Sequence, residues 1–181
     1  MVAQRSPKPL VWVRILASPP MAILDIKKYN DPILRARCEE VKEIDENIKK
    51  IIYDMEEMMI KNNGVGLAAN QVGIKKRIIV VFDLDNSKTI SLINPKILKK
   101  SREKEIGEEG CLSFPDVFLN IKRSRNVKIE GINIKGEKII INAEGFLARV
   151  FQHEIDHING ILFFDRLPFL ERIKFMFKKW P

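Results

Sequence analysis

The chain has only two histidines, and both lie in the segment His153-Glu154-Ile155-Asp156-His157. The surrounding residues 145–158 carry apolar side chains around most of the circumference that a helix would present. A helix of that kind is buried inside a protein rather than exposed on its surface. Its imidazoles and its glutamate must then find polar partners in the interior. The fold therefore has to be built around this helix, with something that satisfies its histidines.

The two histidines stand at positions i and i+4, which places both imidazoles on one face of a helix. Both rings can therefore reach one metal ion. Glu154 lies beside them and can contact water at that metal without being a ligand. The alternative is a hydrogen-bonded pair of core histidines with no metal, which leaves Glu154 without a role.

A catalytic metal site of this kind uses three protein ligands, so two histidines leave one position to fill. Cys111 is a candidate, because it follows Gly107-Glu108-Glu109-Gly110 and a thiolate is a soft ligand. Spacing alone leaves open whether Cys111 binds the metal. The only other cysteine, Cys38, has neighbours that suggest no chemistry, and it is expected to be structural. So few cysteines favour a reducing compartment over a disulfide scaffold.

A third segment, residues 64–71, contains Gly64, Val65 and Gly66, followed by Ala-Ala-Asn and Gln71. Such small residues suggest backbone that packs tightly against something. A phosphate-binding loop fits poorly, because no Lys-Ser/Thr pair follows. A helix cap with a tight turn would explain the two glycines but not the residues that follow them.

Patterns elsewhere predict separate groups of helices and strands. Asp45 is expected to cap a helix whose methionines face the core, and which ends near Asn62-Asn63-Gly64. Further helices are expected near Pro32, over residues 145–158 and from Pro168 to about residue 180, and strands over residues 77–83, 90–93, 126–134 and 138–142. Because helices and strands are segregated, we predict an α+β fold with antiparallel sheets packed around the buried central helix.

The 181 residues suit one domain, which we expect over residues 21–181. Residues 1–20 are basic, free of acids and rich in proline, and are expected to be a leader or extension outside the fold. They fit a transit peptide, an added leader, or a misassigned start, since Met21 could be the initiator. No uninterrupted apolar stretch is long enough for a membrane span.

The formal net charge of +8 favours acidic partners such as RNA or the ribosome. The alternative is a lysine-rich genome, because the lysines are spread along the chain rather than gathered in one block.

Residues 64–71, 109–113 and 152–157 resemble, in order and separation, the three signature motifs of the peptide deformylases. The resemblance runs from about Ile23 to the C-terminal helix. Ile158 departs from the family's common leucine, and the tail after Pro168 is short compared with many bacterial members. The short tail puts a ribosome contact through that tail in question.

The resemblance implies that Cys111, His153 and His157 bind one divalent metal, Fe²⁺ in the cell, with Zn²⁺, Ni²⁺ or Co²⁺ in the purified protein. It implies that Glu154 is the general base and then the general acid. The oxyanion donors would be the Gln71 amide and the backbone N–H of Leu112. The substrate would be bound by the residues of the motifs and of the histidine face, which are Gly64, Val65, Gly66, Glu109, Gly110, Phe146, Arg149 and Val150.

Four of these residues have more particular expectations. Glu109 is expected to pair with Arg123 or Arg125 and hold the cysteine loop, unless it is a solvated surface acid. Phe146 and Val150 are candidates for an apolar pocket that takes a methionine side chain. Arg149 is expected at the mouth of the site rather than at its floor.

The function implied is hydrolysis of the N-terminal formyl group of formyl-methionyl nascent chains, with release of formate. The ribosome near its exit site is then an expected partner, and neither a membrane nor a sequence-specific nucleic acid is expected. The location would be the bacterial cytoplasm, or an organelle if residues 1–20 are a transit peptide.

Two other functions are compatible with parts of the sequence. A general zinc peptidase is disfavoured by the absent third histidine and by the segment that ends in Gln71. An RNA- or ribosome-binding protein with a structural metal would need a fourth ligand, for which Cys38 and Asp156 are the available residues.

Overall fold

The computed structural model describes residues 24–177. The extension expected at residues 1–20 lies outside these described residues, and so does the expected end of the last helix at residues 178–180. Among the helices of the described part, none is long and apolar enough to span a membrane.

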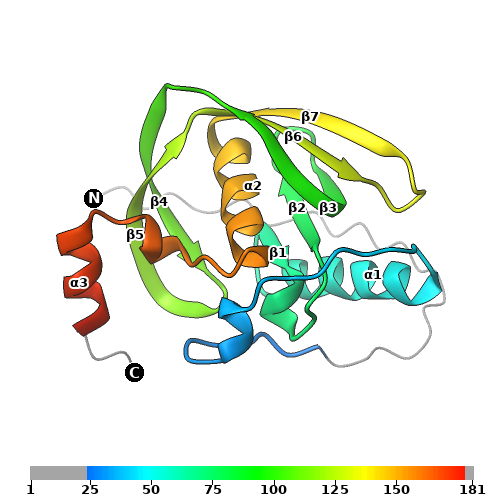
Figure 1. The fold of residues 1–181 in the computed structure, drawn as a ribbon, viewed down its shortest axis with the longest axis horizontal. Helices are drawn as coiled ribbons and strands as arrows, with labels where there is room; N and C mark the ends of the chain where they lie inside the picture. The colour runs from blue at the N-terminus through cyan, green and yellow to red at the C-terminus, as the bar shows by residue number, and fades with distance from the viewer. Residues whose placement is uncertain (1–23, 178–181) are drawn as a thin grey trace.

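The described strands form two antiparallel sheets that surround a central helix, which confirms the predicted α+β fold (Figure 1). The larger sheet has the order β1-β2-β3-β6-β7, and its strands are β1 (Gly66–Ala68), β2 (Ile78–Asp83), β3 (Lys88–Lys100), β6 (Asn126–Ile132) and β7 (Lys138–Glu144). The smaller sheet pairs β4 (Lys104–Cys111) with β5 (Phe114–Ser124). The helical elements are η1 (Pro32–Arg35), α1 (Glu46–Lys61), η2 (Ala69–Val72), α2 (Gly145–Ile158), η3 (Phe163–Arg166) and α3 (Phe169–Phe177).

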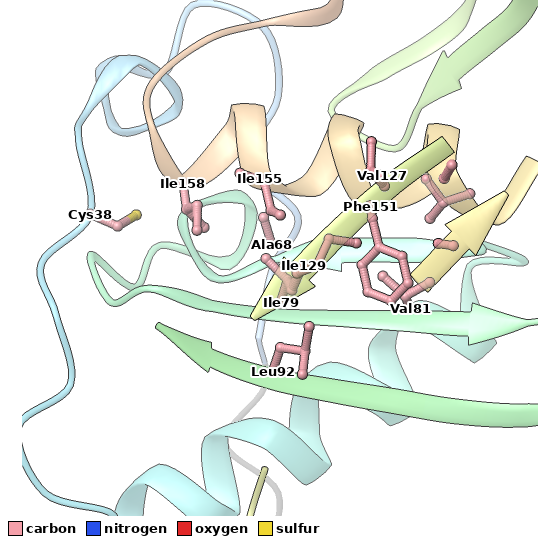
Figure 2. Close-up of a cluster of buried hydrophobic side chains, with 13 residues drawn as sticks. Cys38, Ala68, Ile79, Val81, Leu92, Val127, Ile129, Phe151, Ile155 and Ile158 are labelled. Atoms are coloured by element: carbon pink, nitrogen blue, oxygen red, sulfur yellow. The ribbon is translucent and has the colours of Figure 1, made fainter. Parts of the chain in front are cut away.

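The two long helices cover opposite faces of the larger sheet. Alternate residues of a strand point to opposite faces, and in β2 both faces are apolar. Ile79 and Val81 belong to the cluster that contains Phe151 of α2 (Figure 2). Ile78 and Val80 belong to the cluster that contains the buried residues of α1. The helix that carries both histidines is therefore held by the sheet on one side and is free to face the cysteine hairpin on another.

The helix boundaries follow the predicted capping residues. The Asp45 side chain accepts a hydrogen bond from the N–H of Ile48 at 2.8 Å and caps α1, as expected. Asn63, rather than Gly64, takes the left-handed conformation after this helix, with φ of 54°. At the end of α2, Gly160 takes the left-handed conformation with φ of 74°. The expected span of α2, residues 145–158, is confirmed.

Strand β3 is longer than the sequence indicated. Pro95 cannot donate a hydrogen bond to a neighbouring strand, so the strand was expected to stop before it. The strand continues to Lys100 because the register with β6 shifts between Ile93 and Lys96. Asn94, with φ of 52°, lies in this irregular stretch.

The sequence did not predict β4 and β5 at all. Strand β4 reads Lys-Glu-Ile-Gly-Glu-Glu-Gly-Cys, which is rich in charge and glycine and so has low intrinsic strand preference. It is extended because it pairs with β5 along its whole length. This hairpin carries the cysteine, so its position depends on tertiary pairing.

Replacing Phe151 with alanine should lower the free energy of unfolding by about 3–5 kcal/mol, because its ring has no exposed surface and would leave a cavity. Tyr53→Ala is the control, since this side chain is 58% exposed on α1 and its loss should change stability by about 0.5 kcal/mol or less. Urea unfolding measures both. Equal effects would show that the cluster around α2 is not the core.

Candidate active site

The hairpin of β4 and β5 brings Cys111 to the histidine face of α2. Cys111 pairs with Phe114 across a two-residue turn that closes the hairpin. The preceding Gly110 lies under the ring of Phe118, and a Cβ there would lie 2.9 Å from its Cε1 atom. A larger residue would push the ring away and disturb the backbone beside the cysteine.

Three donor atoms converge between the hairpin and α2. The Sγ atom of Cys111 lies 3.3 Å from Nε2 of His157, and this nitrogen lies 3.2 Å from Nε2 of His153. A tetrahedral cation with metal–nitrogen and metal–sulfur bonds of about 2.1 and 2.3 Å would separate its ligand atoms by roughly 3.3–3.6 Å. The three side chains are a candidate metal-binding group. They therefore fit one metal, and the softness of the donor set suits Zn²⁺, Fe²⁺, Co²⁺ and Ni²⁺.

The carboxylate of Glu109 orients His153. Its Oε2 atom accepts a hydrogen bond from Nδ1 of His153 at 2.9 Å, which leaves Nε2 to face the other two donors. Burial lowers the pKa of His153, but hydrogen bonds to Cys111 and Glu109 outweigh it and hold that pKa well above 6.5. Burial holds the pKa of His157 well below 6.5, and the charge of His153 lowers it further.

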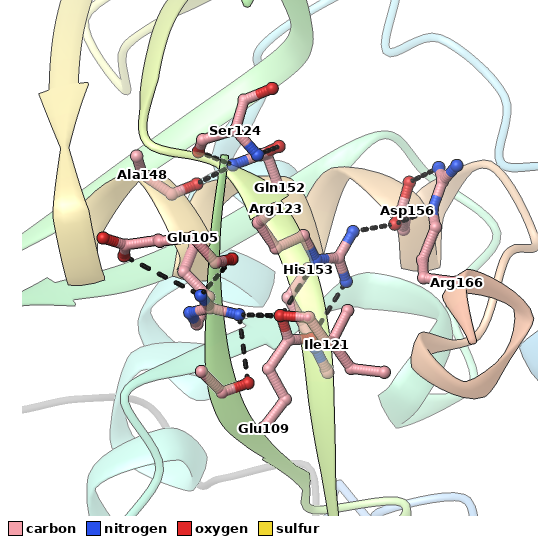
Figure 3. Close-up of polar contacts among 12 residues, drawn as sticks. Glu105, Glu109, Ile121, Arg123, Ser124, Ala148, Gln152, His153, Asp156 and Arg166 are labelled. Atoms are coloured by element: carbon pink, nitrogen blue, oxygen red, sulfur yellow. Dashed lines mark hydrogen bonds and ion pairs between the residues drawn. The ribbon is translucent and has the colours of Figure 1, made fainter. Parts of the chain in front are cut away.

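Glu109 is held in turn by Arg123, as Figure 3 shows. Arg123 donates from Nε and Nη2 to the two carboxylate oxygens at 2.9 and 3.0 Å, and from Nη1 to Asp156 of α2. Burial raises the pKa of Glu109, but hydrogen bonds from His153 and Arg123 outweigh this and lower it to about 2. Of the two expected partners, Arg123 forms the pair, whereas Arg125 bonds to Glu103 at the surface. The alternative of a solvated acid is wrong, because Glu109 is 5% exposed.

Arg149 lies under the hairpin and does not reach the mouth of the cavity. Its side chain is buried, and Nη1 donates to Glu109, to the carbonyl of Gly107 and to the carbonyl of Ile121. A Cβ on Gly107 would lie 2.8 Å from the Cζ atom of this guanidinium. The expected position at the mouth is therefore wrong, because the guanidinium bonds to both strands of the hairpin and to Glu109.

The Glu154 carboxyl group points into the space between α2 and β1. It is buried, and its Oε2 atom has no hydrogen-bond partner among the described residues. Burial raises the pKa of Glu154 to about 7. A Cβ on Gly66 would lie 2.8 Å from Cδ of Glu154, so glycine is needed for the strand to pass this carboxyl group. The glycine at position 66 of this motif is thus explained by the close approach of strand and carboxyl.

The side-chain amide of Gln71 is fixed at both ends. Its Oε1 atom accepts a hydrogen bond from the N–H of Ala68 at 2.8 Å. Its Nε2 atom lies 3.2 Å from Oγ of Ser113 and 3.4 Å from Sγ of Cys111. The amide donor is therefore aimed at the converging ligand atoms.

A cavity of about 470 Å³ opens beside these groups. All the residues expected to bind substrate line it, and they are Gly64, Val65, Gly66, Glu109, Gly110, Phe146, Arg149 and Val150. Phe146 is 49% exposed, whereas Val150 is buried. Sequence reasoning missed Lys28, Asn63 and the start of β5, which also line the cavity. No motif marks Lys28, and the hairpin that brings β5 here was not predicted.

No fourth ligand for a closed structural site is found among residues 24–177. The candidate metal-binding group there contains only Cys111 and the two histidines. Asp156 is engaged with Arg123 and Arg166, and Cys38 lies in the core cluster under α2. An α+β fold with three converging ligands, and no fourth protein ligand among the described residues, fits the class of catalytic rather than closed structural metal sites.

Comparison with known proteins narrows the class. The family model described as polypeptide deformylase matches residues 23–172. Peptide deformylase of Thermotoga maritima is 47% identical over 148 residues, which cover 82% of this chain and 89% of that protein. Peptide deformylase 1 of Clostridium perfringens is 48% identical over 145 residues, which cover 80% of this chain and 98% of that protein.

Solved structures agree with the family model. The crystal structure of the Thermus thermophilus enzyme superposes with a TM-score of 0.80 at 37% identity, covering 85% of this chain and 91% of that one. The Thermotoga maritima crystal structure gives a TM-score of 0.78, covering 82% of this chain and 99% of that one. The chain belongs to the polypeptide deformylase family, whose known activity is removal of the formyl group from nascent peptides.

Replacing Glu109 with glutamine should lower the free energy of unfolding by about 3–5 kcal/mol, because it leaves buried arginine charge without its partner. Glu103→Gln breaks the exposed pair with Arg125 and should cost less than about 1 kcal/mol. Urea unfolding of both variants measures the difference. Similar values would mean that the buried network contributes no more than a surface ion pair.

Proposed function

We propose that the chain is a metal-dependent amidase that hydrolyses the formyl amide of formyl-methionyl peptides. The observation that carries this proposal is the convergence of the Cys111, His153 and His157 donor atoms beside the unpartnered carboxyl oxygen of Glu154. A thiolate and two imidazoles would hold one divalent metal, and we propose Fe²⁺ in the cell, with Zn²⁺, Ni²⁺ or Co²⁺ as replacements in purified protein.

When bound, the metal supplies Lewis-acid activation of water and of the formyl oxygen. Glu154 accepts a proton from the attacking water while the water oxygen bonds to the formyl carbon. The same carboxyl group then gives its proton to the amine nitrogen as the carbon–nitrogen bond breaks. The products are formate and a peptide with a free N-terminus.

The oxyanion that forms in this step needs hydrogen-bond donors already in place. We propose the Nε2 amide of Gln71 and the backbone N–H of Leu112 for this role. The distances of 3.2 and 3.4 Å from Gln71 Nε2 to Ser113 Oγ and Cys111 Sγ support it, because they hold the amide against the cysteine loop.

The substrate would lie in the cavity between the segment at Gly64–Gly66 and the hairpin. We propose that Phe146 and Val150, with Val65, contact the methionine side chain, since they present apolar surface to this cavity. Gly66 would lie against the peptide backbone. We propose that Glu109 and Arg149 hold Gly110 and the cysteine loop in place. Their polar atoms are already bonded within the protein and are not free to bind substrate.

Nascent chains are present where translation takes place. We therefore propose that the protein acts in the bacterial cytoplasm, or in an organelle if residues 1–20 are a transit peptide. Its net charge of +8 supports an encounter with the ribosome near the exit site.

Glu154→Gln should lower formate release from a formyl-methionyl peptide by about 10²- to 10⁴-fold while metal content is kept, because only the proton acceptor is lost. Protein purified without oxygen and loaded with Fe²⁺ or Ni²⁺ would be assayed for formate. Glu144→Gln is the control, since Glu144 is exposed at the start of α2 and makes no cap hydrogen bond with its side chain. Full activity of Glu154→Gln would reject this base, and an inactive metal-loaded parent would reject the proposed function.

Cys111→Ser should lose most bound metal after dialysis, because the soft thiolate ligand is removed. Cys38→Ala should retain metal at the parental level, since Cys38 is a buried core residue outside the candidate metal-binding group. Metal analysis of both variants and the parent is the measurement. Parental metal content in Cys111→Ser would remove Cys111 from the ligand set.

A further inference from the structure

Residues 27–29, here called the strap, cross η2 and the hairpin turn, which carry the proposed oxyanion donors. Lys27 donates its backbone N–H to the carbonyl of Gln71 at 2.7 Å. Tyr29 donates its backbone N–H to the carbonyl of Ser113 at 3.0 Å. Between them, Nζ of Lys28 donates to the carbonyl of Leu112 at 2.8 Å. The strap therefore joins η2, which carries Gln71, to the turn of the cysteine hairpin.

Leu112 and Ser113 are the two residues of that turn, and the strap binds both of their carbonyls. A carbonyl held by a donor restricts the rotation of its peptide plane, and so limits the backbone angles of the residue that bears it. The Leu112 carbonyl shares its peptide plane with the Ser113 N–H, and the φ and ψ angles of Leu112 link that plane to the preceding one, which bears the Leu112 N–H. The ring of Tyr29 also packs on Phe114, with centroids 5.2 Å apart, which holds the strap to the first residue of β5.

Of the three hydrogen bonds described above, the bond from Lys28 to the turn is the one made by a side chain. A hydrogen bond from an ammonium group is charge-assisted and roughly twice as strong as a neutral one. The side chain is exposed and lines the cavity, so the contact is not required to fill the core. Its position next to the proposed oxyanion donor suggests a role in the reaction rather than in folding.

We propose that Lys28 is a positioning residue: its ammonium group holds the Leu112–Ser113 turn so that the Leu112 N–H and the Gln71 amide stay aimed at one point. The inference rests on the proposed function. It requires no contact between Lys28 and the substrate. The Leu112 carbonyl is held by the Lys28 side chain, whereas the other two contacts come from the backbone and do not depend on which side chains the strap carries.

Lys28→Met, which keeps an unbranched chain but loses the ammonium group, tests the proposal, and Lys28→Arg restores a cationic donor. In Lys28→Met, kcat should fall by about 10-fold, because small misplacement of catalytic groups costs up to about 10²-fold. KM and metal content should stay within about twofold, because the proposal places the Lys28 ammonium group on the turn and not on the substrate or the metal. Lys76→Met is the control, because the Lys76 side chain is 40% exposed and its Nζ bonds to Glu39, away from the cavity.

A second measurement does not depend on activity. In protein loaded with diamagnetic Zn²⁺, the NMR order parameters of the Leu112 and Ser113 amides should fall from about 0.85 toward about 0.6 in Lys28→Met. They should remain at the parental value in Lys76→Met and return toward it in Lys28→Arg.

Unchanged kcat with unchanged order parameters would overturn the proposal. A rise in KM at constant kcat would overturn it as well, because Lys28 would then act on substrate binding. A loss of kcat with a rigid turn would also do so, since the ammonium group would act directly. If the metal-loaded parent releases no formate, the proposed function fails, and the order parameters alone decide whether Lys28 holds the turn.

Discussion

The buried carboxylate of Glu109 is the interaction on which the site depends. It accepts hydrogen bonds from Arg123, Arg149 and His153, which belong to β5 and α2. A buried carboxylate is costly unless its oxygens are satisfied, and here charged donors satisfy them. One side chain therefore fixes the hairpin to the helix and sets which nitrogen of His153 faces the other ligands. The metal site follows from the way these two elements are joined.

The polar residues around the site fall into those whose groups are bonded within the protein and one with an unbonded oxygen. Arg123, Arg149 and Asp156 have their polar groups bonded within the protein, so they stiffen the contact between hairpin and helix. Glu154, in contrast, keeps an oxygen without a partner in the same buried region. An unsatisfied buried oxygen is costly to the fold and available to a reactant. This contrast supports the proposal that Glu154 is the residue that reacts.

Much of the fold could be predicted, because its signals are local. The Asp45 cap, the span of α2 and the hairpin at Gly136 depend on neighbours within a few residues. The hairpin of β4 and β5 could not be predicted, since Gly107 and Gly110 are poor strand residues whose small size serves contacts with Arg149 and Phe118. The burial of Arg149 was missed for the same reason. Its acceptors are carbonyls of that hairpin, and no pattern around position 149 reveals them.

The sequence by itself determined the chemistry that the helix can offer, because i and i+4 spacing places His153 and His157 on one face wherever the helix lies. It also determined, through three motifs in order, the family to which the chain belongs. Only the tertiary structure showed that the Cys111 sulfur lies beside both histidine nitrogens, that Arg123 rather than Arg125 binds Glu109, and that Lys28 reaches the turn at Leu112. Each of these contacts joins residues that are well separated in the chain. Their distance is set by strand pairing and packing, which local sequence does not encode.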